Sequence, residues 1–184
     1  VSGTVNVNGG IDTSDYYGLY IDPNLSGALN IGGGVSAASH VALTGSITGN
    51  GTVTIGGMNS GSMQVLGQMA SGSTVKVIGG LGSGGLIDVN STGNTSSTTG
   101  GTIWIGEEIP QNPPPSTLTF DGAVNVNACD GGTFTGLVKV VGCASDSMSH
   151  RNAAICINGT NSGTISYYAQ NCSHGFRTVC INSC

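Results

Sequence analysis

The stretch Leu29–Val89 reads LNIGGGVSAASHVALTGSITGNGTVTIGGMNSGSMQVLGQMASGSTVKVIGGLGSGGLIDV, and it contains an internal repeat. Pairs of the form apolar-x-apolar recur at almost even spacing and begin at positions 29, 41, 53, 63, 75 and 87. Gly, Ser, Asn and Thr fill the intervals, and one more apolar residue follows most pairs three or four positions later. Such a period indicates stacked coils that bury a common core. The pairs are Leu29/Ile31, Val41/Leu43, Val53/Ile55, Met63/Val65, Val75/Val77 and Ile87/Val89, and the single apolar residues are Val35, Ile47, Met58, Met69 and Leu81.

Alternation with period 2 is typical of short strands, and no long helical pattern occurs. In a parallel β-solenoid each strand pairs with the equivalent strand of the coils above and below, so its backbone groups find partners. Side chains at i and i+2 then point inward, and the residue between them points outward. We therefore predict an all-β, single-domain parallel β-helix. Five of the six predicted outward residues are polar: Asn30, Ala42, Thr54, Gln64, Lys76 and Asp88.

The sequence is compatible with two coil lengths. The step from one pair to the next, about 12 residues, is either a whole thin coil or one side of a flattened coil of about 22–24 residues. We favour the longer coil, because two apolar pairs and the residues after the glycines then enclose a wider core. A third side is compatible with insertions.

The pattern extends over the whole chain, so we predict one solenoid over residues 1–184. It starts at Val5/Val7, is most regular over 19–89, and ends at Val179/Ile181. Polar and proline-rich segments at 90–101 and 107–117 interrupt it and are predicted to be loops. Between them, Ile103 and Ile105 resume the pattern with Trp104 pointing outward, and residues 129–184 form a cysteine-rich part.

The composition excludes several classes of function. Only 7% of the residues are charged, against roughly 25% in average soluble domains. Four basic residues against nine acidic ones leave too few cations for a nucleic-acid partner. No segment approaches the roughly 20 apolar residues of a membrane helix, so we expect no membrane insertion. The absence of a visible signal peptide fits a processed secreted chain, and equally a fragment of a longer protein.

The cysteines are even in number and clustered, which predicts disulfides in an oxidising compartment. Cys156 lies between Ile155 and Ile157, and Cys180 lies between Val179 and Ile181. If one coil is about 24 residues long, these two cysteines stack about 4.8 Å apart, within bridging distance. Cys156–Cys180 is therefore the favoured pair, with Cys129–Cys143 and Cys172–Cys184 as one arrangement of the others. The six predicted disulfide cysteines are Cys129, Cys143, Cys156, Cys172, Cys180 and Cys184.

Candidate metal ligands are few. Asp12, Asp15 and Asp22 could bind calcium, but loop aspartates more often cap turns. A zinc site from Cys172, His174 and His150 is the alternative to disulfides, and it lacks Cys-x2-Cys spacing. We expect no metal and no cofactor.

Catalytic candidates are equally weak. Glu107 and Glu108 are adjacent and would point to opposite faces of an extended chain, which does not suit a two-carboxylate glycosidase. His40, His150 and His174 have no nucleophile motif around them. Pectin-lyase-like chemistry would need Asp, Arg and Lys clustered on successive coils, and the sequence shows no such cluster. We expect no catalytic residues.

Threonine and tyrosine offer binding alternatives. Thr-x-Thr occurs at 52–54, 117–119 and 133–135, and aligned threonine columns would suggest ice binding. The threonines do not recur at the repeat spacing, so ice binding is not favoured. Tyrosines could instead contact a sugar or cover the coil ends: Tyr16, Tyr17, Tyr167 and Tyr168.

The runs Val53–Met58 and Val75–Leu81 resemble the Gly-Gly repeats of bacterial extracellular β-solenoids, which occur in surface, adhesin-like and autotransporter-type proteins. The resemblance covers about residues 19–89 and implies secretion with a structural or adhesive role. The strand pattern runs to both ends without a capping helix, and unpaired edges favour addition of another chain. We therefore expect an extracellular structural subunit that stacks head to tail into a filament or surface layer. The alternative is an adhesin or carbohydrate-binding module using the 90–101 and 107–117 loops; ice binding and a pectin-lyase-like enzyme are less favoured.

Overall fold

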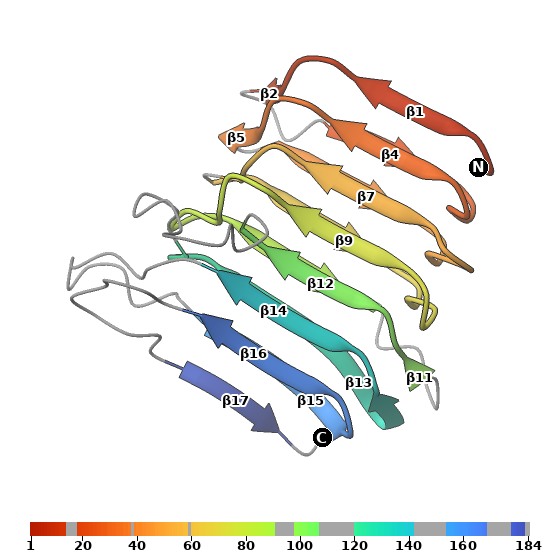
Figure 1. Cartoon of the computed structure of the whole chain (residues 1–184), viewed down its shortest axis with the longest axis vertical. Coiled ribbons are helices and arrows are strands. Elements are labelled where there is room, and N and C mark those ends of the chain that lie inside the picture. Colours follow the sequence, from red (N-terminus) through yellow and green to blue (C-terminus); the bar gives the residue numbers. More distant parts are fainter. Residues whose placement is uncertain are drawn as a thin grey trace.

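The computed structural model describes residues 1–13, 18–37, 39–58, 60–90, 98–106, 120–141, 154–168 and 178–182. Over these residues the chain is an all-β parallel solenoid without a helix, as predicted. Figure 1 shows the strands stacked along one axis, from β1 (Thr4–Val7) at one end to β17 (Thr178–Asn182) at the other.

Two parallel sheets form the long walls of the solenoid. The first sheet runs in the order β1, β4 (Ala28–Ile31), β7 (Thr52–Ile55), β9 (Thr74–Val77), β12 (Thr102–Ile105), β14 (Leu137–Val141) and β16 (Thr164–Tyr168). The second sheet runs in the order β3 (Gly18–Ile21), β6 (His40–Leu43), β8 (Ser62–Val65), β10 (Leu86–Val89), β13 (Ala123–Phe134), β15 (Ala154–Asn161) and β17. A short sheet of β2 (Ile11–Thr13) and β5 (Val35–Ala37) lies at one corner, and β11 (Thr98–Thr99) pairs with β13.

The longer of the two predicted coil lengths is correct. In the first sheet Leu29 pairs with Val53, and Val53 pairs with Val75. In the second sheet Val41 pairs with Met63, and Met63 pairs with Ile87. Successive apolar pairs therefore alternate between the two walls, two pairs to a coil.

The core lies between the walls. Every apolar pair of the Leu29–Val89 stretch is buried, because parallel stacking places equivalent side chains above one another. The single apolar residues that follow the pairs close the two narrow sides. One narrow side is the bridged column Val35, Met58, Leu81 and Phe120, and the other is Leu25, Ile47 and Met69.

Glycines stand where successive coils turn closely over one another. A Cβ on Gly56 would lie 1.9 Å from the carbonyl oxygen of Gly33, and one on Gly79 would lie 2.4 Å from that of Gly56. Distances below 3.0 Å are incompatible with a side chain unless the backbone moves. The Gly-Gly element of the repeat is thus explained by backbone contact between coils.

Two local predictions need correction. Ala42 stands in an outward position of its strand by register but is buried. Thr98–Thr99, expected in a loop, is the strand β11 paired with Thr133–Phe134. Phe120, the first described residue after position 106, forms an isolated bridge with Leu81.

The favoured disulfide is present. Cys156 and Cys180 pair in register between β15 and β17, with a Cα–Cα distance of 4.6 Å. The other four predicted disulfide positions cannot be compared in the same way, because Cys143, Cys172 and Cys184 lie outside the described residues and the side chain of Cys129 is not described.

Candidate functional site

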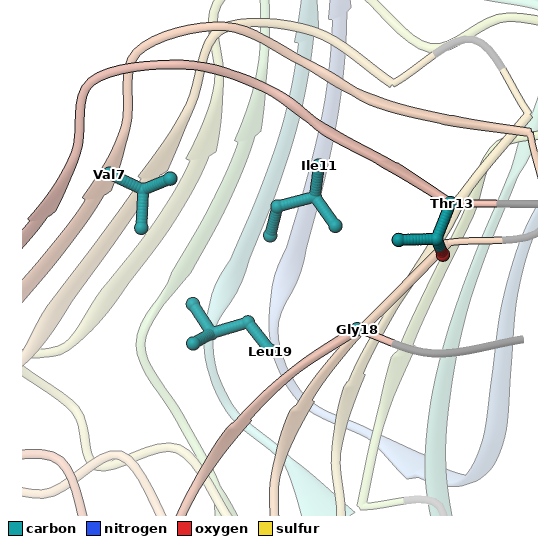
Figure 2. A pocket seen from close by; sticks show the side chains of 5 residues that line it. All are labelled: Val7, Ile11, Thr13, Gly18 and Leu19. Atoms are coloured by element: carbon teal, nitrogen blue, oxygen red, sulfur yellow. The ribbon is translucent and has the colours of Figure 1, made fainter.

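The first described coil leaves part of the core open at the N-terminal end of the solenoid. Val7, Ile11 and Leu19 come from β1, β2 and β3, and all three are only partly buried. With Thr13 and Gly18 they line a pocket of about 210 Å³. Figure 2 shows the side chains of Val7, Ile11 and Leu19 pointing into the same space. In the next coil the equivalent positions are buried, because another coil covers each side of them.

The last described strand leaves core positions open at the other end. Val179 and Ile181 continue the columns of Ile155 and Ile157, which are fully buried. In β17, however, Val179 is 47% exposed and Ile181 is 56% exposed. In the first sheet, Ile165 and Tyr167 of β16 are likewise only partly buried. Both ends therefore present apolar side chains of the same inward columns.

The two walls begin and end together. Within the described residues each main path contains seven strands, from β1 to β16 in one wall and from β3 to β17 in the other. All of them are parallel, so each wall has one free edge at each end. Because the walls contain equal numbers of strands, the two free edges at an end belong to the same coil. A second parallel coil could pair with both.

One column on the outer face of the first sheet combines aromatic and cationic side chains. Trp104 of β12 pairs in register with Lys76 of β9 and with Lys139 of β14. The Nζ atom of Lys76 lies 4.7 Å from the centroid of the Trp104 ring, and that of Lys139 lies 4.0 Å from it. These are cation–π distances. The indole Nε1 is buried and has no hydrogen-bond partner in the described part of the chain.

Threonines recur in register, and the prediction that they do not was wrong. Thr52, Thr74 and Thr102 are unequally spaced in the chain, which hides their alignment in the sequence. Beside this column lies the one containing Lys76 and Trp104, so a flat surface of paired threonines is not maintained along the wall. The first-wall column consists of Thr4, Ala28, Thr52, Thr74, Thr102, Leu137 and Thr164.

Polar side chains on the second wall bond to one another along the axis. Asn158 Nδ2 donates to Asn127 Oδ1 at 2.7 Å, and Asn127 Nδ2 donates to Asp88 Oδ1 at 2.7 Å. Burial raises the pKa of Asp88 above its ordinary value of 3.8, and the hydrogen bond from Asn127 opposes this rise. Such ladders stabilise coil stacking.

His40 is the first residue of β6, which lies next to β3 in the same wall. Its Nδ1 lies 2.6 Å from Ser62 Oγ, on the next strand. Burial lowers the pKa of His40 from its ordinary value of 6.5, and a side-chain hydrogen bond with Gln64 opposes this change. The tilted ring of Tyr20 lies 6.0 Å away, centroid to centroid. His40 itself is buried, and its contact with Ser62 joins two successive coils.

Of the candidate metal and catalytic residues, the structure describes Asp12, Asp22 and His40. Within the described residues no group of three or more His, Cys, Asp or Glu side chains could hold a metal ion. Asp22 instead accepts a hydrogen bond from Thr44 Oγ1. Tyr167 and Tyr168 lie in β16. The other candidates lie outside the described residues: Asp15, Tyr16, Tyr17, Glu107, Glu108, His150, Cys172 and His174. Most of the loop surface suggested for glycan binding, 91–97 and 107–117, lies there too.

No family model, no curated protein and no solved structure matches this chain.

The Lys76–Trp104–Lys139 column was missed in the sequence although a pattern for it exists. Each of the three residues is the central member of an apolar pair, and aligning every second pair would have placed them in one column.

Among the described residues there is no helix long and apolar enough to cross a membrane.

Proposed function

We propose that this chain is an extracellular structural subunit that stacks head to tail into a filament. The observation that supports it best is the exposure of Val179 and Ile181, core residues by register, at one end of the solenoid. The opposite end presents the pocket around Val7, Ile11 and Leu19. Burying these apolar surfaces against each other would be favourable at about 25 cal/mol for each Å² removed from water.

The strand edges favour the same contact. In a head-to-tail stack, β16 of one copy pairs with β1 of the next, and β17 pairs with β3. This pairing satisfies the backbone groups of four edge strands at once. The contact joins two different surfaces, so it does not close and propagates as a filament.

Low charge and the disulfide also support this role. The net charge is −5 over 184 residues, so stacked subunits repel one another weakly. The Cys156–Cys180 bridge ties the last described strand to its neighbour and supports an oxidising compartment.

Electron microscopy of the purified 184-residue chain tests the proposal. Seven strands per wall at a spacing of about 4.8 Å predict an axial rise of about 34 Å per subunit. A population that stays monomeric at high concentration under oxidising conditions would contradict the proposal.

Two end-blocking variants test the direction of stacking. Ile181→Lys introduces a charge at the C-terminal end, and Leu19→Lys introduces one at the N-terminal pocket. Each variant alone is expected to stay monomeric, because a buried unpaired charge is costly. Mixed together, they retain one intact end each and should form heterodimers that stop at two subunits. Dimers of either variant alone would indicate an end contact between like surfaces and would overturn head-to-tail stacking.

A matched control separates the end surfaces from a general effect of added lysine. Thr164→Lys places the same charge on an exposed outward position of β16. This variant should still form filaments. Circular dichroism spectra of all three variants check that the solenoid is folded.

A further inference from the structure

We propose that the Lys76–Trp104–Lys139 column on the outer face of the first wall is a binding site for acidic polysaccharide. The ligand class is a linear glycan carrying carboxylate or sulfate groups. The site lies on the side of the solenoid and is complete within one subunit, so it does not depend on the filament.

The charge distribution points to an anionic ligand. The chain has only four basic residues and a net charge of −5, yet two of those four stand in one column around a single aromatic ring. Neither lysine has an ion-pair partner among the described residues. Two cations held together with no carboxylate partner in the described part of the chain repel each other. A ligand with regularly spaced anionic groups relieves that repulsion.

Trp104 holds the two ammonium groups in place. Its ring contacts Lys76 from one neighbouring strand and Lys139 from the other. These contacts restrict two flexible side chains before any ligand arrives, which lowers the entropic cost of binding. Because the lysines occupy the ring, sugar stacking on Trp104 is not part of the proposal; recognition is through charge and hydrogen bonds.

The chemistry favours a glycan over a nucleic acid. Both bear regularly spaced anions, but affinity for nucleic acid grows with the number of phosphates neutralised, and two lysines neutralise few. The neighbouring outward positions supply hydroxyl groups suited to bonding with sugar hydroxyls. They are Thr52, Thr54, Thr74, Thr102 and Ser166.

The single tryptophan provides a direct probe. Trp104 is the only tryptophan of the chain, so its fluorescence reports on this site alone. We expect heparin and polygalacturonate to change the fluorescence saturably and in competition with each other, with affinity falling as salt rises. Neutral dextran should produce no change.

Charge-matched variants decide whether polysaccharide binding depends on this site or on the overall charge of the chain. Lys76→Gln/Lys139→Gln should weaken binding by about tenfold or more, and Lys76→Arg/Lys139→Arg should retain most of it. Arg151→Gln/Arg177→Gln removes the same two positive charges, giving −7 from −5, and should bind like the unmodified chain. Binding of these variants, all of which keep Trp104, is measured by calorimetry, and thermal unfolding checks their fold.

The proposal is overturned if the unmodified chain binds neither acidic polysaccharide. It is also overturned if both charge-removing variants lose affinity equally, or if dextran binds as well as heparin. Binding of a single-stranded nucleic acid more tightly than heparin would likewise overturn it and assign the column to the other ligand class.

Discussion

Cys156 and Cys180 occupy the same outward position on the adjacent strands β15 and β17, where a disulfide joins them across a Cα–Cα distance of 4.6 Å. Their sequence separation of 24 equals one regular coil, the same separation that stacks Asn30 on Asn6. The bridge therefore links one coil to the next without changing the register of the apolar pairs beside it. It fixes the last described strand, which has a neighbour on only one side.

Removing this bridge should destabilise the protein. Cys156→Ser/Cys180→Ser is expected to lower the free energy of unfolding by about 3 kcal/mol, because the unfolded chain regains the entropy of a 24-residue loop. Urea denaturation without reductant measures the difference. Mass spectrometry of the native, non-reduced protein provides the control, since free thiols at both positions would show that the bridge is not formed.

Truncation of a core pair should cost much more than truncation of the outward residue beside it. Ile55→Ala is expected to lower the free energy of unfolding by about 2–5 kcal/mol, because Ile55 is fully buried between the walls. Thr54→Ala, on the outward side of the same strand, should change it by about 0.5 kcal/mol or less. Equal effects of the two substitutions in urea denaturation would contradict the inward and outward assignment.

A methyl group at a coil corner should be poorly tolerated. Gly56→Ala places a Cβ 1.9 Å from the Gly33 carbonyl oxygen, and we expect a loss of about 1–3 kcal/mol in stability. Gly9→Ala is the matched control, because nothing lies within 4 Å of its added Cβ. The difference between the two midpoints of thermal unfolding measures the effect. A stable Gly56→Ala protein would show that the coils are not stacked this closely.

The buried histidine should make the fold sensitive to acid. Burial lowers the pKa of His40 below 6.5 in the folded state, so the unfolded state binds more protons as pH falls. The stability associated with neutral His40 is present above pH 6.5 and is lost as pH falls through the folded-state pKa. His40→Gln should therefore reduce the slope of unfolding free energy against pH just below 6.5. An unchanged slope in urea titrations across this range would show that His40 does not titrate in a buried contact.

The architecture could be predicted from the sequence because the residues that form the repeat are buried in the core. Val53/Ile55 and Met63/Val65 lie on opposite walls, and each pair stacks on the second pair before it and the second pair after it. Only the longer of the two coil lengths puts successive pairs on opposite walls and stacks every second pair. The cysteine pair added an independent measure of the same period. These positions are predictable because burial restricts the side chain at each one.

The Lys76–Trp104–Lys139 column was not predicted, and the reason is physical. Lys76, Trp104 and Lys139 are unequally spaced in the chain, because segments of variable length separate their strands. Burial places no restriction on outward residues, so their alignment follows only from the apolar residues on either side of them, taken at every second pair. The same irregularity concealed the alignment of Thr52 with Thr74 and Thr102.

The unequal connections have a further consequence. Ile103 stays in register with Val138, and Ile87 with Val124, although the chain between the partners is much longer than a regular coil. Lengthening a closed loop costs little free energy once the strands at its two ends are paired. The spacing of the strands is thus independent of what the chain carries between them.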